Sequence, residues 1–202
     1  MPMQSDAPDR RQALVEAAYR ALAKHGFEGL RMRAVAADAG IDHSTIHHHF
    51  ATKRDLVAAV VDYATRQFRP KGPPTRRTTL DEHLEMLGRM IAEYPQLHAV
   101  LRELDLRAGR DAEVRAIIVE HEKGWRTALT ARIREAASIG AWPAHIDATA
   151  GTELVIAVVK GASLNLGRAT QILHQLRLLV AAPGTARATS GSARPSSRRR
   201  RS

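Results

Sequence analysis

The chain of 202 residues contains no cysteine, which excludes a disulfide framework and any thiolate metal site. It also lacks a long hydrophobic run. The longest run, Leu154 to Val159, ends at Lys160 and is far too short to span a bilayer. The first residues, MPMQSDAPDRRQ, lack the apolar segment of a signal peptide. These absences predict a cytoplasmic protein that makes no membrane contact.

Proline is absent between Pro8 and Pro70, which suits a helical first domain. The Pro- and Gly-rich segment that starts at Pro70 indicates a linker. Apolar residues at helical spacing, with no convincing strand pattern, predict an all-α fold. We expect a first helical domain at 9–69, a second helical domain at 79–182, and a disordered Arg-rich tail at 183–202. Outside the motif described below, helices are predicted at 10–25, 52–68, 79–94, 95–107, 111–138, 144–166 and 170–181. Capping boxes are predicted at two of these helix starts, Thr52 with Asp55 and Thr79 with Glu82.

The positive charge is distributed unevenly. The chain carries a formal net charge of +10, yet residues 1–56 carry 8 Lys and Arg against 7 acids. Residues 80–182 carry 12 against 13, whereas the last 20 residues carry six Arg and no acid. Attraction of phosphate to the first domain must therefore come from local placement of charge. The tail is expected to add only non-specific affinity for DNA.

The stretch around Gly40 has the pattern of two short helices joined by a tight turn. Met32 to Ala39 carries a one-sided apolar stripe, and Gly40 suits the left-handed position after a helix end. Asp42 can cap the next helix, in which Ile46 and Phe50 share one face. Helix, short glycine turn and helix with a polar outer face is typical of a helix-turn-helix.

This stretch resembles the N-terminal domain of TetR-type transcriptional regulators, with the helix-turn-helix at about 31–50. The resemblance covers roughly residues 10 to 60. It implies an N-terminal three-helix domain joined by a fourth helix to a C-terminal helical ligand-binding and dimerisation domain. The residues that carry it are Gly26-Phe27, Val35-Ala36, Ala39-Gly40-Ile41, Thr45-Ile46, His49-Phe50, Lys53 and Leu56.

Three residues depart from the pattern of that family. Arg31 stands where the family usually has Thr or Ser as a helix cap, Ser44 where it has Gly, and His47 where it has Tyr. The last two lie on the side that the resemblance implies for DNA. They put the individual DNA contacts in question but leave the docking mode intact.

Eight residues are candidate DNA contacts. The resemblance implies that Thr45 donates to a phosphate, that Arg33 reaches a base edge, and that Lys53 binds a phosphate together with a helix N-terminus. The alternatives are a solvated helix face and, for Arg33, an ordinary surface arginine. The full set is Arg31, Arg33, His43, Ser44, Thr45, His47, His48 and Lys53.

His43 and His47 are four residues apart, the spacing of two zinc ligands on one helical turn. No cysteine and no obvious carboxylate shares their face within the motif. We therefore expect no metal site and no cofactor. His49 is more simply explained as a packed histidine beside Phe50.

The resemblance implies an effector cavity among the C-terminal helices, for a small apolar molecule. His98 and Arg102 lie one turn apart, as do His121 and Trp125, and these four residues are candidate pocket residues. The alternative is a core tryptophan with ordinary surface neighbours.

Residues 154–166 and 172–180 are the most apolar helical stretches. They form either the core of a monomer or the two-helix surface of a homodimer, which the paired half-sites of an operator favour. In the dimer, Val158 and Leu176 are predicted to lie at the interface, and Gly161 and Ala162 would allow close helix approach.

The sequence therefore predicts a sequence-specific DNA-binding transcriptional regulator, acting as a repressor released by a small-molecule effector. Its partners would be a double-stranded DNA operator and a second copy of the chain. No Gly-rich phosphate loop and no G-x-S-x-G motif supports an enzyme. Two alternatives remain open: a sequence-independent DNA-binding protein that relies on its Arg tail, and a small helical carrier or enzyme with a vestigial helix-turn-helix.

Overall fold

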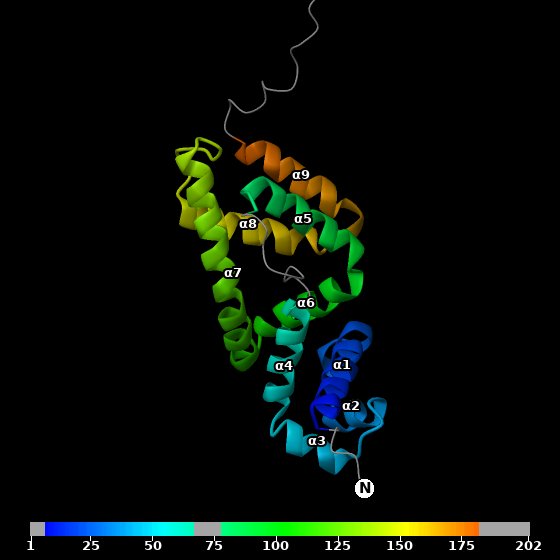
Figure 1. The fold of residues 1–202 in the computed structure, drawn as a ribbon. Coiled ribbons are helices and arrows are strands. Elements are labelled where there is room, and N and C mark those ends of the chain that lie inside the picture. The colour runs from blue at the N-terminus through cyan, green and yellow to red at the C-terminus, as the bar shows by residue number, and fades with distance from the viewer. Residues whose placement is uncertain (1–6, 67–77, 182–202) are drawn as a thin grey trace, which may run out of the picture.

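The computed structural model describes residues 7–66 and 78–181, with the side chains from residue 9 onward. Over these residues the fold is all-α, as predicted (Figure 1). The linker that starts at Pro70 and the Arg-rich tail lie outside the described residues, so the predictions about them remain predictions.

The N-terminal helices follow the predicted order. The second helix of the helix-turn-helix motif is short, and the next helix begins after a connection of three residues. The elements are α1 (Ala7–His25), the 3-10 turn η1 (Phe27–Gly29), α2 (Met32–Asp38), α3 (His43–His49) and α4 (Lys53–Arg66). Four side chains of the stripe predicted for the first helix, those of Leu14, Ala17, Ala18 and Leu22, are buried.

The C-terminal part contains five further α-helices, most of which lie above the first group in Figure 1, while the longest of them runs down beside α4. They are α5 (Leu80–Glu93), α6 (Pro95–Ala108), α7 (Ala112–Ser138), α8 (Ala148–Ala162) and α9 (Ala169–Val180), with the 3-10 turn η2 (Leu166–Arg168) before α9. The predicted capping box between Thr79 and Glu82 is confirmed at the start of α5.

The prediction of one helix over 144–166 is wrong at both ends. The indole N–H of Trp142 donates to the carbonyl of Ile146 at 2.8 Å and holds a turn there. Asp147 then caps α8 by accepting from the amides of Thr149 and Ala150. The apolar composition continues beyond Ala162, but there the chain leaves the helix before η2.

Two hydrophobic cores lie in the described part of the chain. The boundary between them does not coincide with the predicted linker, because the first core contains residues from both sides of it. The first core joins α1 to α4 with α6 and the start of α7, through residues such as Leu97, Leu104 and Ile118. The second core joins α5, α8 and α9 with the end of α7, including Leu129 and Ile133. The long helix α7 therefore spans both cores, and α6 packs with the N-terminal helices.

Ion pairs between helices join the same elements. Lys160 on α8 contacts Asp105 on α6 at 2.8 Å and also Glu122 on α7. Burial opposes the charge of Lys160, but hydrogen bonds to these two carboxylates outweigh it and raise the pKa of Lys160. Arg177 on α9 holds Asp81 on α5 with two contacts of 2.6 Å. The half-buried Lys160 pairs fix α6, α7 and α8 at one point, and the more exposed Asp81–Arg177 pair holds α5 against α9 at another.

The close approach of Gly151 to Trp142 gives a stability prediction. A Cβ at Gly151 would lie 2.4 Å from Cζ2 of Trp142, inside van der Waals contact. The indole is fixed by its bond to Ile146, so Gly151→Ala should lower the free energy of unfolding by about 1–3 kcal/mol. Urea unfolding at fixed protein concentration measures this change.

Gly124→Ala is the matched control, since Gly124 lies within α7 and a Cβ there meets no atom within 4 Å. Alanine should stabilise that helix by up to about 1 kcal/mol. Effects of the same sign for both substitutions would contradict the packing at Trp142.

Candidate nucleic-acid interface

The turn between α2 and α3 has the geometry expected of a helix-turn-helix. Gly40 adopts a φ of 67°, in the left-handed region. The amide of Ile41 donates back to the carbonyl of Ala36 at 2.9 Å, and that of Gly40 donates to Ala37 at 3.1 Å, which closes α2. The left-handed conformation predicted for Gly40 after the helix end is therefore confirmed.

Asp42 caps α3, as predicted. Its Oδ1 accepts from the backbone amide of Ser44 at 2.8 Å and from the hydroxyl of Ser44. The hydroxyl bond, followed by the amide bond, lowers the pKa of Asp42, so the cap is ionised at neutral pH. Because Ser44 donates its hydroxyl proton to its own cap, its oxygen remains available mainly as an acceptor toward DNA.

One face of α3 is anchored in the first core and the other is exposed. Ile46 and Phe50 are fully buried, and the guanidinium of Arg11 lies 4.9 Å from the centroid of the Phe50 ring. His43, Ser44, His47 and His48 are exposed, whereas Thr45 and His49 are half-buried. The exposed set is the polar face that the sequence indicated.

The rings of His43 and His47 lie 5.2 Å apart, edge to face. Within the described residues, no group of three or more His, Asp or Glu side chains gathers in a way that could hold a metal ion. The pair by itself supplies only two of the three or four ligands that a zinc site needs.

Arg31 and Arg33 are both exposed at the start of α2. Arg31 occupies the N-cap position, with a φ of −111°, and its side chain makes no capping hydrogen bond. The arginine at this position therefore leaves the start of α2 without a side-chain cap and adds an exposed guanidinium beside that of Arg33.

Lys53 is the first residue of α4 and is half-buried. Its Nζ lies 4.2 Å from the centroid of the Phe27 ring, and the guanidinium carbon of Arg107 lies 4.5 Å from the same centroid. Burial lowers the pKa of Lys53, and the nearby Glu28 carboxylate partly opposes that shift. The predicted capping box of α4 is present, because Thr52 and Asp55 exchange hydrogen bonds in both directions.

The turn at Phe27 is also held by residues of α6, and the sequence did not predict this contact. The amide of Phe27 donates to Oε1 of Glu103 at 3.0 Å, across 76 residues of sequence. Arg107, one turn further along α6, contacts Glu28 at 3.5 Å and Asp111 at 3.1 Å. No local pattern marks such a pairing, although Gly26-Phe27 stood out as part of the motif.

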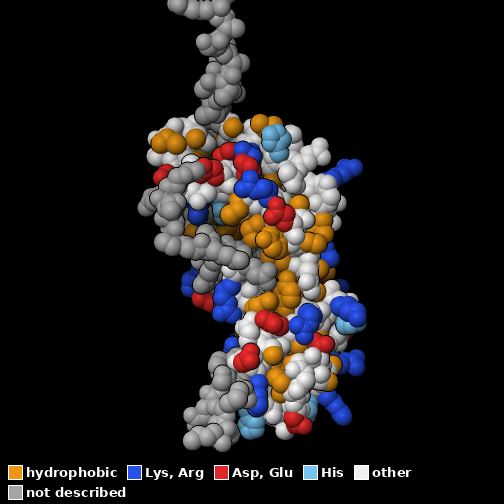
Figure 2. Space-filling model, turned by 45° about the vertical axis from the view of Figure 1, so that its right-hand side comes forward, with side chains coloured by type: hydrophobic (Ala, Val, Ile, Leu, Met, Phe, Trp, Pro, Cys, Tyr) orange, Lys and Arg blue, Asp and Glu red, His pale blue; other side chains and the backbone are white. Residues whose placement is uncertain are grey.

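Charge on the lower part of the molecule, where α1 to α4 lie, is mixed. Figure 2 shows Lys and Arg side chains there interspersed with acidic side chains and histidines, rather than a continuous basic face. This agrees with the near-neutral balance of residues 1–56, which carry 8 Lys and Arg against 7 acids.

The four candidate effector residues lie on α6 and α7. His98 is buried, and burial followed by the charge of Arg102 lowers the pKa of His98. Arg102 is half-buried and donates to the carbonyl of Ser163 at 3.5 Å. His121 and Trp125 are half-buried on α7, where Trp125 packs against the second core.

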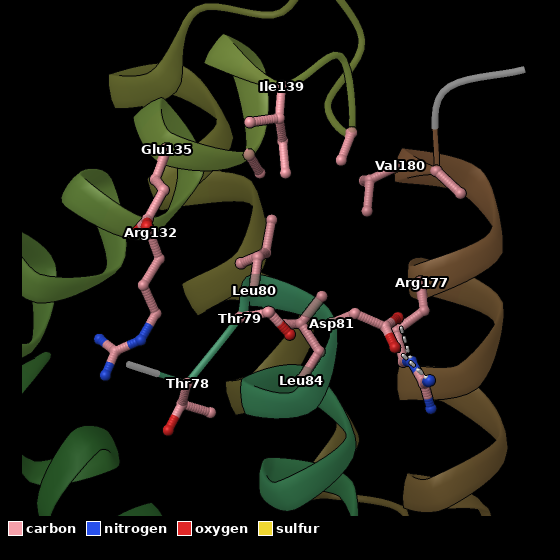
Figure 3. Close-up of a pocket in the computed structure, with 13 residues that line it drawn as sticks. Thr78, Thr79, Leu80, Asp81, Leu84, Arg132, Glu135, Ile139, Arg177 and Val180 are labelled. Carbon is pink, nitrogen blue, oxygen red and sulfur yellow. Dashed lines mark hydrogen bonds and ion pairs between the residues drawn. The ribbon is translucent and has the colours of Figure 1, made fainter. Parts of the chain in front are cut away.

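A pocket in the described structure lies elsewhere and contains none of these four residues. It has a volume of about 450 Å³ and lies between the start of α5, the end of α7 and the end of α9 (Figure 3). Leu80, Ile139 and Val180 give it apolar walls, and the Asp81–Arg177 pair lies on one side.

Arg132 lies on another side of this pocket. The buried Nε of Arg132 and the buried Nε2 of the nearby His83 have no hydrogen-bond partner among the described residues. Burial, followed by the charge of Arg132, lowers the pKa of His83 to about 4.

Exposed apolar side chains lie on α8, in the turn after it and on α9, and we call them the apolar strip. Leu154 on α8 and Leu164 in the turn after α8 are 45% and 61% exposed, and Leu178 on α9 is 57% exposed. Val158 is half-buried, whereas Leu176 and Ala162 are only 5% and 1% exposed and pack in the second core. The prediction that Leu176 lies at a dimer interface is therefore wrong, because this side chain packs within its own protomer.

The described helices include none long and apolar enough to cross a membrane.

The family described as "Bacterial regulatory proteins, tetR family" matches residues 14–60. Among curated proteins, the transcriptional regulator BetI of Agrobacterium fabrum is 26% identical over 142 residues, which are 66% of this chain and 68% of that protein. The transcriptional repressor AcnR of Corynebacterium diphtheriae is 26% identical over 134 residues, 65% of this chain and 67% of that protein.

Solved structures share the fold. A TetR-family regulator from Rhodococcus sp. superposes with a TM-score of 0.75 at 22% identity, over 85% of this chain and 98% of that one. A transcriptional regulator from Saccharomonospora viridis, solved in complex with choline, has a TM-score of 0.70 at 18% identity, over 84% of this chain and 96% of its own.

The cap at Asp42 gives a prediction about the order of α3. Asp42→Ala removes the acceptor for the Ser44 amide, so amides of α3 should exchange with solvent roughly fivefold faster. Asp42→Asn keeps an oxygen acceptor and should retain most of the protection. Hydrogen exchange followed by mass spectrometry measures both variants. Equal protection of α3 in the wild type and in Asp42→Ala would show that the cap does not hold the helix.

Proposed function

We propose that this chain, which belongs to the TetR family of bacterial transcriptional regulators, is a homodimeric repressor that a small-molecule effector releases from its operator. The observation that carries the proposal is the arrangement of α2 and α3. A tight glycine turn and a carboxylate cap hold α3, whose apolar face is buried and whose polar face is free. A helix held in this way can enter the major groove of DNA.

Residues of α2 and α3 would make the contacts to the duplex. The face with His43, Ser44, His47 and His48 would meet base edges, and Thr45 would donate to a phosphate. Arg33 is exposed at the start of α2, and a guanidinium can grip a guanine through two hydrogen bonds. Arg31 beside it would add a phosphate or base contact.

Lys53 would act on a phosphate together with the N-terminus of α4. Its ammonium lies over Phe27, and burial lowers its pKa. An approaching phosphate would oppose that shift, because a nearby negative charge favours the protonated amine.

A second copy of the chain would cover the apolar strip on α8 and α9. Ala157 and Gly161, both exposed, lie between Leu154 and Leu164 and would allow close approach of the partner helices. Pairing α8 and α9 of two protomers would make a four-helix bundle. A two-fold dimer also presents two copies of α3, as paired half-sites require.

The effector would bind among the C-terminal helices. The relative AcnR is a transcriptional repressor by name, and the Saccharomonospora regulator was solved with choline. The pocket lined by Leu80, Ile139 and Val180 has the size and apolar walls of a small-molecule site. The buried His98 and the half-buried Arg102, His121 and Trp125 remain the candidates for a site nearer the DNA-binding helices.

Control would pass through α6. On one side Glu103 and Arg107 contact the turn at Phe27, and on the other Asp105 pairs with Lys160 of α8. A ligand that displaces α6 would shift Lys53 and the spacing of the two α3 helices. By linkage, DNA would weaken effector binding by the same factor by which the effector weakens DNA binding.

Selection of bound duplexes from a random pool tests the proposal. Enrichment of one two-fold symmetric sequence supports it. Equal retention of all duplexes would favour the sequence-independent alternative, and no salt-dependent retention of any duplex would favour the carrier or enzyme alternative. A version ending at residue 182 should select the same sequence, since the Arg-rich tail would add only non-specific affinity.

Lys53 and Arg33 should differ in what they contribute to binding. Lys53→Ala should weaken all duplexes about equally and reduce the salt slope by about 1 for each protomer, because it removes a phosphate contact. Arg33→Ala should lower discrimination at one or two base pairs by about 1–3 kcal/mol. Titration of operator variants by fluorescence anisotropy at several salt concentrations separates the two effects. An unchanged preference in Arg33→Ala would refute its base-reading role.

Leu154 and Leu178 are exposed and therefore test the dimer, whereas Leu176 is buried within its own protomer. Leu154→Glu and Leu178→Glu should each shift the protein toward monomer and weaken operator binding, because a charge would be buried in the bundle. Val119→Glu is the matched control, since Val119 is 56% exposed on α7 and lies outside the strip. Analytical ultracentrifugation at micromolar concentration gives the oligomeric state. A wild type that sediments as a monomer would contradict the dimer.

A further inference from the structure

The recognition helix carries no permanent positive charge. Between residues 43 and 49 it has four histidines and no Lys or Arg. Three of the four, His43, His47 and His48, are exposed on the side away from the core. Imidazole is the side chain whose ordinary titration range crosses physiological pH. The charge that α3 carries toward a duplex is therefore set by protons.

We propose that operator binding takes up protons on these exposed histidines, so that the protein binds its operator more tightly as the pH falls from 8 to 6. The proposal rests on the function above, in which α3 enters the major groove. Phosphates line both sides of that groove, and nearby negative charge favours the protonated form of an imidazole. A protonated imidazole also offers two N–H donors, and guanine presents two acceptors there, N7 and O6.

Some charged neighbours of α3 favour a positive charge on its histidines, and others oppose it. Hydrogen bonds from Ser44, and after them the charge of the neighbouring His43, lower the pKa of the cap Asp42. Asp38 on α2 is already paired with Arg20 at 2.8 Å, and Asp55 on α4 is bonded to Thr52. The cations on the surrounding elements oppose protonation until a phosphate neutralises them. They are Arg11 on α1, Arg31 and Arg33 on α2, and Lys53 and Arg54 on α4.

The spacing of the rings limits the number of protons. The rings of His43 and His47 are 5.2 Å apart, so two charges on this pair would repel each other. We expect one proton on the pair and a second on His48, which gives at most two for each copy of α3.

The size of the effect follows from linkage. If each copy of α3 takes up about 0.4 proton on average between pH 8 and pH 6, binding strengthens about sixfold for each protomer, or about 40-fold for the dimer. Because the bound state holds more protons than the free state, this gain is present at acid pH and is lost as the pH rises. Affinity therefore rises toward acid pH and does not fall.

The test uses the full-length protein and the duplex chosen by selection at pH 6 and at pH 8. Dissociation constants are measured at pH 6, 7 and 8 at constant ionic strength. A chelator is present because a histidine pair at this spacing can hold a transition metal. Calorimetry in two buffers of different ionisation enthalpy counts the protons taken up. The variants are His43→Gln, His47→Gln, His48→Gln and the triple variant, with His145→Gln in the α7–α8 turn as control, and thermal unfolding at each pH confirms folding.

We expect roughly 40-fold tighter binding at pH 6 than at pH 8, net proton uptake, and loss of both in the triple variant but not in His145→Gln. A flat pH profile without proton uptake would overturn the inference and leave the proposed function standing. So would a triple variant that keeps the wild-type pH dependence. Failure to enrich any duplex at either pH would overturn the proposed function itself, and this inference with it.

Discussion

The ring of Phe27 is the point on which the two halves of the structure depend. The ammonium of Lys53 and the guanidinium of Arg107 both lie within 4.5 Å of its centroid, and its amide donates to Glu103. Contacts of a cation with an aromatic ring contribute about 0.5–2 kcal/mol each, more where water is excluded. The turn after α1, the start of α4 and the end of α6 are therefore held by one side chain.

This arrangement explains how a repressor of this shape can respond to a distant ligand. Lys53 would bind a phosphate, while Arg107 and Glu103 belong to a helix that also carries Asp105, the partner of Lys160 on α8. Movement of α6 would shift Arg107 and the Phe27 ring, and so would directly change the surroundings of the Lys53 ammonium. Because α8 is also the candidate dimer helix, the same movement would change the angle between protomers, and the two effects would add.

Local chemistry explains which parts of the fold were predictable from the sequence. Gly40, Asp42 and the Thr52–Asp55 pair each act within a few residues, and all three appear as predicted. The packing of α6 in the first core and the contact of Glu103 with Phe27 across 76 residues are long-range, and no periodicity encodes them. Leu176 shows a different limit: α9 is apolar on both sides, and only packing reveals which side faces its own protomer.

The cap and the histidines of the short helix α3 depend on each other. Seven residues are too few to form a stable helix alone, so α3 relies on the Asp42 cap and on the burial of Ile46 and Phe50. His47 and His48 lie in its last turn, where a positive charge is favoured by the helix dipole. The protons that would attract a duplex would thus also strengthen the end of the helix that binds it. A neutral α3 would be both less attractive to DNA and less ordered, so acid pH would favour the bound state through two routes with the same sign.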